Sequence, residues 1–349
     1  MKQDTLMNLI GTYGARIDAR AEKLFTQSDY PLYGMMRYFM GYVDEHFNPV
    51  SKPVGKRIRP GLILLIADSY GILEEAIPAA LSVEIFHNFT LIHDDVVDHD
   101  ELRRGRPTVW KLWGVDHAIN TGDAQLILAF RALEEPTLLP AERIATLRTH
   151  LLSRYSEVSE GQYLDFTLAT TKLDDPSVTE RAYLTMTEKK TAKLIRATTE
   201  VAPILAGRSE EEIEALGDFG ENLGMAYQLY DDWQGIWGAP EKTGKKRAGD
   251  IYEKKKTLPV IHAREHLAPA DRQRLEDLYD GEVLNEDTVT EVLEFFAKTE
   301  AQNALIGCAA RYKSNALGAI ARMNLPEQTR ALLERITHAF VPDIVIESR

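Results

Sequence analysis

Three aspartates lie within five residues in the segment HNFTLIHDDVVDHDELRRGRPT, residues 87–108. On a helix, Asp94 and Asp98 would lie one turn apart on the same face, with Asp95 beside them. Like charges at this spacing destabilise a helix unless a cation neutralises them, and Mg²⁺ takes one or two carboxylates together with water and substrate phosphate. A solvated acidic face would show the same spacing. We favour a metal site because the preceding stretch, residues 81–92, is strongly apolar.

A second aspartate pair, Asp231 and Asp232, lies in the apolar and aromatic segment YQLYDDWQGIWG, residues 227–238. Two acidic pairs on two helices of a bundle can face each other across its core. No Glu-x-x-His motif accompanies them, and aspartates with few histidines favour Mg²⁺ over iron or zinc. We therefore predict Mg²⁺ at both aspartate groups.

Basic residues cluster close to both acidic groups in the sequence. Lysine binds phosphate as a point charge and arginine as a bidentate fork. Each cluster alone would be typical of a solvated face, but two carboxylate sites combined with several basic groups indicate two substrates that carry diphosphates. The clusters comprise Lys56, Arg57, Arg59, Arg103, Arg104, Lys189, Lys190, Lys193, Lys245, Lys246, Arg247, Lys254, Lys255 and Lys256.

The elements that must position these residues are helices. Apolar residues recur every three or four positions, and no alternating strand pattern bounded by tight turns is present. Length alone would suggest two domains, but no linker divides the chain. We predict a single-domain, all-α helical bundle over residues 1–349, with residues from about 268 to 349 as a peripheral helical part. The helical segments are 5–28, 58–71, 74–102, 116–134, 141–170, 178–206, 210–236 and 289–322.

Composition narrows the class of protein. The chain has 349 residues and a formal net charge of −13, which disfavours general nucleic-acid binding. Its one cysteine, Cys308, excludes a disulfide scaffold and fits a reducing compartment. The longest apolar run, residues 62–67, is far shorter than the roughly 20 residues of a membrane span, and the N-terminus is polar. We expect a soluble, cytoplasmic protein without a transmembrane segment.

Six motifs in order make a joint signature between about residues 52 and 263. They are GKRIRP, HNFTLIHDDVVD with LRRGRPT, GQYLDF, EKKTAKLI, YQLYDD, and TGK followed by KKTLP. With them the chain resembles the trans-isoprenyl diphosphate synthases, or polyprenyl synthetases. The resemblance implies an all-α bundle around a deep central cavity and a homodimer. It also implies a reaction that joins isopentenyl diphosphate head-to-tail to an allylic diphosphate.

The resemblance also implies roles for individual residues. The aspartates would bind three Mg²⁺ ions that bridge the allylic diphosphate, and they are Asp94, Asp95, Asp98, Asp231 and Asp232. Contacts to the same substrate would come from Arg103, Lys190, Thr191, Gln228, Lys245 and Lys255, with Arg103 and Lys190 counted as catalytic. Isopentenyl diphosphate would be held by Lys56, Arg59, His87 and Arg104, and Gln162 would face the cavity.

Two positions depart from the family pattern. The second motif is usually DDxxD, but here Gly235 replaces the last acid and gives DDWQG. We expect one water-mediated metal contact to be missing and activity to be kept. Trp110 stands where many members have histidine.

Product length in the family depends on bulky residues four, five and eight positions before the first aspartate motif. Here they are Thr90, Phe89 and Phe86, and the two phenylalanines would form a floor roughly 8–12 Å below the metals. Phe89 with the small Thr90 resembles geranylgeranyl (C20) diphosphate synthases, which is our prediction. Phe86 leaves farnesyl (C15) diphosphate open, and both phenylalanines could instead be ordinary core residues.

Two other functions share part of this pattern. A class I terpene cyclase would carry an NDxxSxxxE-type second site, which is absent, and would not need Lys56, Arg59 and Arg104. A non-catalytic partner subunit would usually have lost aspartates or basic ligands, whereas nearly all of them are present.

Overall fold

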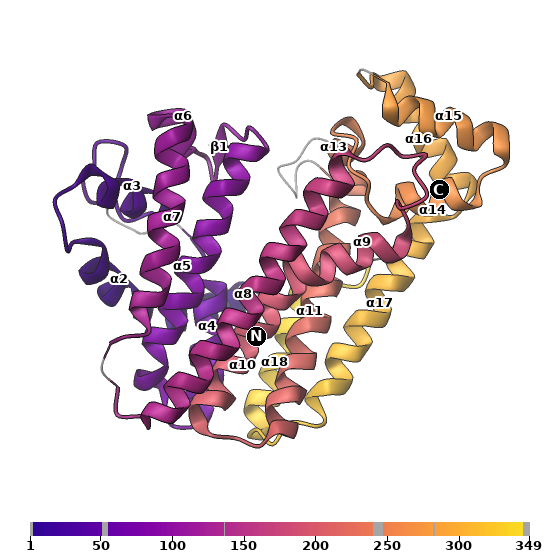
Figure 1. Cartoon of the computed structure of the whole chain (residues 1–349). Helices are drawn as coiled ribbons and strands as arrows, with labels where there is room; N and C mark the ends of the chain where they lie inside the picture. The colour runs from indigo at the N-terminus through magenta and orange to yellow at the C-terminus, as the bar shows by residue number, and fades with distance from the viewer. Residues whose placement is uncertain (1–2, 51–54, 136, 240–246, 282, 345–349) are drawn as a thin grey trace. The chain divides into compact units, whose positions relative to one another are not determined.

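The chain folds almost entirely into helices. The computed structural model describes residues 3–50, 55–135, 137–239, 247–281 and 283–344 (Figure 1). The structure is 76 % helical, which confirms the all-α prediction. Among the described residues, the two named strands form a single antiparallel pair that registers Leu102 with Pro107 and Arg103 with Arg106. No helix in the described ranges is long and apolar enough to cross a bilayer.

The chain divides into two compact units. Unit 1 comprises Met1–His150, Thr198–Ile213 and Leu325–Thr329, and unit 2 comprises Leu151–Ala197, Glu214–Asn324 and Arg330–Arg349. Helices α8, α10, α11 and α18 contribute residues to both. The predicted single domain with a peripheral part from about residue 268 stays a prediction.

Unit 1 is built around the 25-residue helix α5, which packs along α4 and α7 (Figure 1). Residues 76–86 of α5 are all buried, so this stretch has no side that faces solvent. The elements are α1 (Gln3–Gly14), η1 (Ala15–Ile17), α2 (Asp18–Phe25), α3 (Pro31–Met40), α4 (Ile58–Ser69), α5 (Leu73–Val97), β1 (Leu102–Arg103), β2 (Arg106–Pro107), α6 (Val109–Trp113), α7 (Val115–Ala132) and the start of α8 (Ala141–Thr170).

Unit 2 has a core shared by α9, α11 and α14 to α17. Tyr183, Leu229, Val260 and Phe296 belong to it, and α14 packs against α9, α15, α16 and α17 (Figure 1). The elements after α8 are α9 (Glu180–Thr187), η2 (Glu188–Ala192), α10 (Lys193–Ala206), α11 (Glu210–Trp237), α13 (Gly249–Tyr252), α14 (Leu258–His266), α15 (Pro269–Asp280), α16 (Glu286–Lys298), α17 (Ala301–Ile320) and α18 (Glu327–Phe340).

The predicted helix 178–206 contains a change of helix type. Its middle, η2, is a π-helical segment between α9 and α10. Such bulges are frequent at functional sites. Helix α8 approaches η2 so closely that a Cβ placed on Gly161 would lie 2.1 Å from the backbone nitrogen of Lys190. Only glycine fits at this contact, because the opposing atoms are backbone and cannot turn aside.

We predict that Gly161→Ala lowers the free energy of unfolding by about 1–3 kcal/mol, because the added methyl overpacks α8 against η2. The matched control is Gly307→Ala on α17, where no atom lies within 4 Å of the added Cβ. The control should gain about 0.5–1 kcal/mol from helix propensity alone. Urea unfolding measures both, and equal effects of the two variants would contradict the close contact at Gly161.

Candidate active site

The first aspartate motif lies at the C-terminal end of α5. Asp94 is half-buried, Asp95 is buried, and Asp98 is exposed one residue beyond the last helical position. The Asp98 backbone N–H donates to the Asp94 carbonyl at 2.8 Å, which continues the helical turn. The buried length of α5 therefore carries the motif from the core of unit 1 to its surface.

Asp95 combines burial with an incomplete set of partners. Arg103 Nε donates to its Oδ1, whereas its buried Oδ2 has no hydrogen bond within the described part of the chain. Burial raises the pKa of Asp95 to about 6, and the opposing effect of Arg103 is smaller. An orphaned buried carboxylate oxygen needs a partner, and a cation is one that fits.

Arg103 and Arg104 lie on the β1–β2 hairpin, so the expectation of a helix running to residue 102 is wrong. Arg104 and Gly105 both have positive φ, 53° and 74°, as a two-residue type I′ turn requires. The loop between α5 and the hairpin is fixed by Trp110, whose Nε1 donates to the Asp100 carbonyl at 2.8 Å. This bond gives Trp110 a structural role that the sequence did not reveal.

The residues predicted to hold isopentenyl diphosphate gather around His87. Burial is the main cause that lowers the pKa of His87 well below its ordinary value, and the charges of Arg59 and Arg104 add to it. This shift favours the neutral form of the half-buried imidazole. Exposed Lys56 follows Gly55, and a Cβ built on Gly55 would lie 3.5 Å from Arg104 Nη1. Unit 1 thus brings these four predicted side chains into one neighbourhood.

A row of aromatic rings lies below the first aspartate motif on α5. The Phe86 and Phe89 ring centroids are 5.5 Å apart, and Phe89 meets His93 edge-on at 4.9 Å. His93 fills the space beside Gly122 of α7, where an added Cβ would lie 2.3 Å from its Nε2. Phe86 is buried, whereas Phe89 and Thr90 are half-buried.

The second aspartate pair lies on α11 in unit 2. Asp232 is buried and accepts hydrogen bonds from the Tyr183 hydroxyl and, at 2.9 Å, from Gln228 Nε2. Both bonds favour the carboxylate, but burial outweighs them and raises the pKa of Asp232 to about 7. Asp231 is half-buried on the adjacent position.

The π-helical segment η2 joins this pair to α8. Thr191 Oγ1 donates to Gln228 Oε1 at 3.1 Å, so Thr191, Gln228 and Asp232 form a continuous chain. Lys190 Nζ lies 2.6 Å from Asp165 Oδ2. Gln162 is half-buried on α8, three residues before Asp165.

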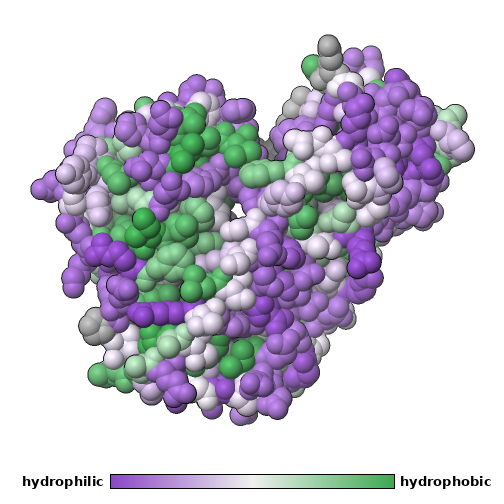
Figure 2. Space-filling view, in the orientation of Figure 1, coloured by the Kyte–Doolittle hydropathy of each residue, from purple (hydrophilic) through white to green (hydrophobic). Residues whose placement is uncertain are grey.

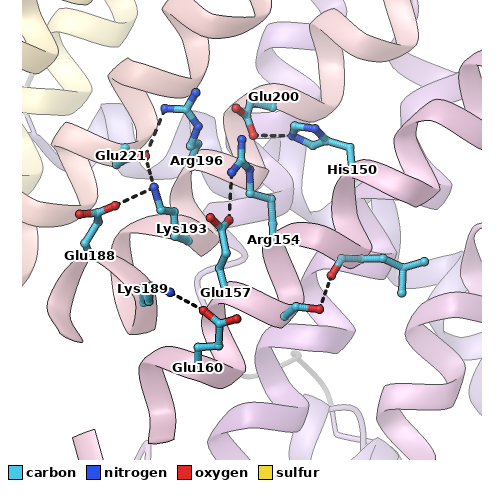
Figure 3. Close-up of polar contacts among 12 residues, drawn as sticks. His150, Arg154, Glu157, Glu160, Glu188, Lys189, Lys193, Arg196, Glu200 and Glu221 are labelled. Carbon is cyan, nitrogen blue, oxygen red and sulfur yellow. Dashed lines mark hydrogen bonds and ion pairs between the residues drawn. The ribbon is translucent and has the colours of Figure 1, made fainter. Parts of the chain in front are cut away.

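The cations next to Lys190 are held by acids. Figure 3 shows Lys189 paired with Glu160, and Lys193 and Arg196 both paired with Glu221. The Lys193–Glu221 and Arg196–Glu221 distances are 2.8 and 3.1 Å. These contacts brace η2 against α8 and α10 against α11, so the neighbours of Lys190 have structural partners of their own.

Lys255 follows α13 and pairs with Asp250 at 3.0 Å and with Glu253 at 2.8 Å. These carboxylates raise the pKa of Lys255 against the effect of burial. Lys245, predicted to contact the same substrate, lies outside the described residues.

The residues fit magnesium better than a softer metal. The donors are carboxylate oxygens, and the orphaned Oδ2 of Asp95 offers a ligand atom. Within the described ranges, no group of three or more His, Cys, Asp or Glu side chains is placed to hold an ion. Mg²⁺ commonly takes only one or two protein carboxylates and completes its shell with water and phosphate oxygens. Asp94, Asp95, Asp98, Asp231 and Asp232 could hold it in this way.

The sequence analysis did not identify two contacts to the predicted site residues. Tyr183 on α9 reaches Asp232, and Asp165 on α8 reaches Lys190. Asp165 belongs to the GQYLDF motif, and this was the only feature of the sequence that could have identified it as a site residue. Nothing in the sequence marks Tyr183, because its role depends on the packing of α9 against α11.

Comparison with known proteins places the chain in a family. Residues 41–296 match the family described as polyprenyl synthetase. A (2E,6E)-farnesyl diphosphate synthase of Mycobacterium tuberculosis is 37 % identical over 314 residues, which cover 88 % of this chain and 85 % of that protein. A geranylgeranyl diphosphate synthase of Methanosarcina mazei is 42 % identical over 212 residues, which cover 60 % and 64 %.

Solved structures agree with this assignment. A geranylgeranyl pyrophosphate synthetase from Pyrococcus horikoshii superposes with a TM-score of 0.87 and 30 % identity, over 98 % of this chain and 99 % of that one. A polyprenyl synthetase from Streptomyces coelicolor gives a TM-score of 0.82 and 28 % identity, over 94 % and 97 %. The chain therefore belongs to the polyprenyl synthetase family of trans-isoprenyl diphosphate synthases, and it is a prenyltransferase.

Proposed function

We propose that this short-chain prenyl diphosphate synthase condenses isopentenyl diphosphate with allylic diphosphates and releases geranylgeranyl diphosphate. The observation that carries the proposal is that one unit holds both an aspartate motif at the end of α5 and a histidine, His87, close to Arg59 and Arg104. The aspartate motif suits the diphosphate that leaves, because a metal ion can bind it there. The histidine and arginines suit a second diphosphate, which is bound but not cleaved. A terpene cyclase would not need the second arrangement.

The aspartate group of each unit would hold Mg²⁺ for the allylic diphosphate, as the resemblance to the family implies. Mg²⁺ would supply Lewis-acid stabilisation of the charge that develops on the leaving diphosphate. Arg103, Lys190 and Lys255 would neutralise the same charge from the protein side. Thr191 and Gln228 would orient the diphosphate, and the chain of hydrogen bonds to Asp232 supports that placement.

The proposed second site would hold isopentenyl diphosphate with Lys56, Arg59, His87 and Arg104. A neutral imidazole can donate one hydrogen bond to a phosphate oxygen without adding to the repulsion among nearby arginines. Fixing this substrate places its double bond over the allylic cation, and an apolar surrounding keeps water from the cation. Diphosphate itself can take the departing proton, so no side-chain base is required.

Chain length rests on the aromatic row of α5. Phe89, braced by Phe86 and His93, would close the product pocket, while Thr90 leaves space beside it. The relative of M. mazei supports a C20 product. A C15 product is the second candidate, because Phe86 is a further bulky residue and the M. tuberculosis relative is a farnesyl diphosphate synthase.

We also propose a homodimer that forms through α7. Val115, Ile119 and Ile127 share one face of this helix and are 42 %, 43 % and 61 % exposed. Figure 2 shows hydrophobic residues gathered on the surface where α7 lies in Figure 1. A second copy of the chain would cover this apolar face. Sedimentation should give twice the mass of the chain, and a monomeric chain would contradict this proposal.

The metal role of the first motif predicts that Asp94→Ala lowers kcat by several orders of magnitude while the fold stays intact. The reason is the loss of a carboxylate that would hold Mg²⁺ at the leaving group. Steady-state kinetics with isopentenyl and allylic diphosphates measure the rate, and circular dichroism measures the fold. Asp116→Ala, which removes an exposed acid of α7, is the control. Near-normal turnover in Asp94→Ala would refute the metal role.

The chain-length proposal predicts that the wild-type chain makes mainly C20 diphosphate from C5, C10 and C15 primers. Phe89→Ala should make longer products, because it removes the pocket floor. Leu91→Ala is the control, since Leu91 packs on the other side of α5 against a separate hydrophobic cluster. Chromatography of the products measures chain length. An unchanged product from Phe89→Ala would show that Phe89 is not the floor, and no elongation with any primer would defeat the proposed function.

The raised pKa of Asp232 predicts a pH-dependent metal affinity. Protons compete with Mg²⁺ for this carboxylate, so the affinity should fall as the pH drops through about 7. Tyr183→Phe removes a hydrogen bond that stabilises the ionised form, so the fall should begin at a higher pH. Tyr230→Phe, another half-buried tyrosine of unit 2, should leave the profile unchanged. Mg²⁺ titrations from pH 5.5 to 8.5 measure the shift, and coincident profiles for the wild type and Tyr183→Phe would contradict the assignment.

A further inference from the structure

The β1–β2 hairpin carries two of the proposed substrate contacts on a very small element. Arg103 lies on β1, and Arg104 follows it in the turn. Each of the two strands has two residues. A two-stranded hairpin by itself is at best marginally stable in water. Contacts from outside the hairpin must therefore fix where Arg103 and Arg104 lie.

Arg106 on β2 joins the hairpin to α3 and to the loop that follows α3. Its Nη2 donates to the Val43 carbonyl at 2.6 Å, and its Nη1 donates to the Tyr38 carbonyl at 3.2 Å. The guanidinium carbon also lies 3.9 Å from the centroid of the Tyr38 ring. The planar fork of an arginine makes two hydrogen bonds and stacks on a ring at the same time, whereas a lysine ammonium does not.

Tyr38 completes the connection in the opposite direction. It is buried, and its hydroxyl donates to the Pro107 carbonyl of β2 at 2.7 Å. Trp113 of α6 meets the Tyr38 ring edge-on at 5.1 Å, and Phe47 stacks on Trp113 at 5.6 Å. Phe47 in turn lies against Gly34 of α3, where an added Cβ would lie 2.8 Å from the Phe47 ring. The ring under the guanidinium is thus held in place by packed aromatic side chains.

Arg106 also bears on the direction of Arg103. The two residues lie directly opposite each other in the antiparallel register, so their side chains start on the same face of the hairpin. Like charges at such positions repel. Arg103 is paired with Asp95 and, at 3.4 Å, with Asp100, whereas Arg106 is bound to the carbonyls of residues 38 and 43. These separate partners hold the two guanidiniums apart and leave Arg103 beside the aspartate motif.

We propose that Arg106 is a positioning residue for prenyl transfer, which fixes the hairpin so that Arg103 and Arg104 can bind diphosphate. Arg106 touches neither substrate in this role. The inference rests on the proposed function, which assigns Arg103 to the allylic diphosphate and Arg104 to isopentenyl diphosphate. A purely structural role would make Arg106 an anchor for the fold, without influence on substrate affinity.

The first test is Arg106→Lys, which keeps the positive charge but removes the fork. Steady-state kinetics at saturating allylic diphosphate should show a KM for isopentenyl diphosphate raised by about 10–100-fold, the size of effect that a displacement of about 1 Å produces. The matched control is Arg143→Lys, because Arg143 is a half-buried arginine of unit 1 whose Nη1 donates to the Leu205 carbonyl at 3.1 Å. Partial unfolding lowers kcat and leaves KM unchanged. A wild-type KM in Arg106→Lys, or an equal rise in both variants, would overturn the inference.

A double variant tests whether Arg106 acts through Arg104. Calorimetry measures the binding of isopentenyl diphosphate to Arg104→Gln, to Arg106→Lys and to the double variant. Because a positioning residue has no effect once the residue it positions is gone, adding Arg106→Lys to Arg104→Gln should weaken binding by less than about twofold. Losses that multiply in the double variant would overturn the inference. Wild-type affinity in Arg104→Gln would instead overturn the proposed function of Arg104, and this inference with it.

Discussion

The structure depends on one physical constraint: two aspartates, Asp95 and Asp232, are buried, and burial opposes their ionisation. Burial raises the pKa of Asp95 to about 6 and that of Asp232 to about 7, although each accepts hydrogen bonds that favour its charge. Desolvation outweighs these partners in both cases. Under the proposed function, a divalent cation would supply the positive charge that these buried carboxylates lack.

Each unit uses different elements to position the residues around its buried aspartate. In unit 1, α5 is buried over much of its length and carries the motif outward, while the β1–β2 hairpin presents Arg103 to Asp95. In unit 2, the π-helical segment η2 and the close contact at Gly161 bring Thr191 to Gln228, which reaches Asp232. In both units, an interruption of regular α-helix positions a residue near the aspartates. The interruption is the hairpin that carries Arg103 in unit 1 and the π-helical segment that carries Thr191 in unit 2.

Much of this could be predicted from the sequence, for identifiable reasons. Helix α8 begins and ends at the predicted residues 141 and 170, because its apolar period is long and uninterrupted. The hairpin at residues 102–107 was missed because a two-residue strand has no alternating pattern. The η2 segment was missed because a π-turn keeps helical composition. Tyr183 bonds to Asp232, 49 positions away, so only packing reveals it.

The central claim is the proposal that each aspartate group binds divalent ions together with diphosphate. The most direct measurement is anomalous scattering from a crystal grown with Mn²⁺ and an allylic diphosphate analogue in which sulfur replaces the ester oxygen. The account predicts manganese peaks ligated by Asp94 and by Asp231, with diphosphate bound. Manganese at only one aspartate group, or a diphosphate bound without either, would contradict it.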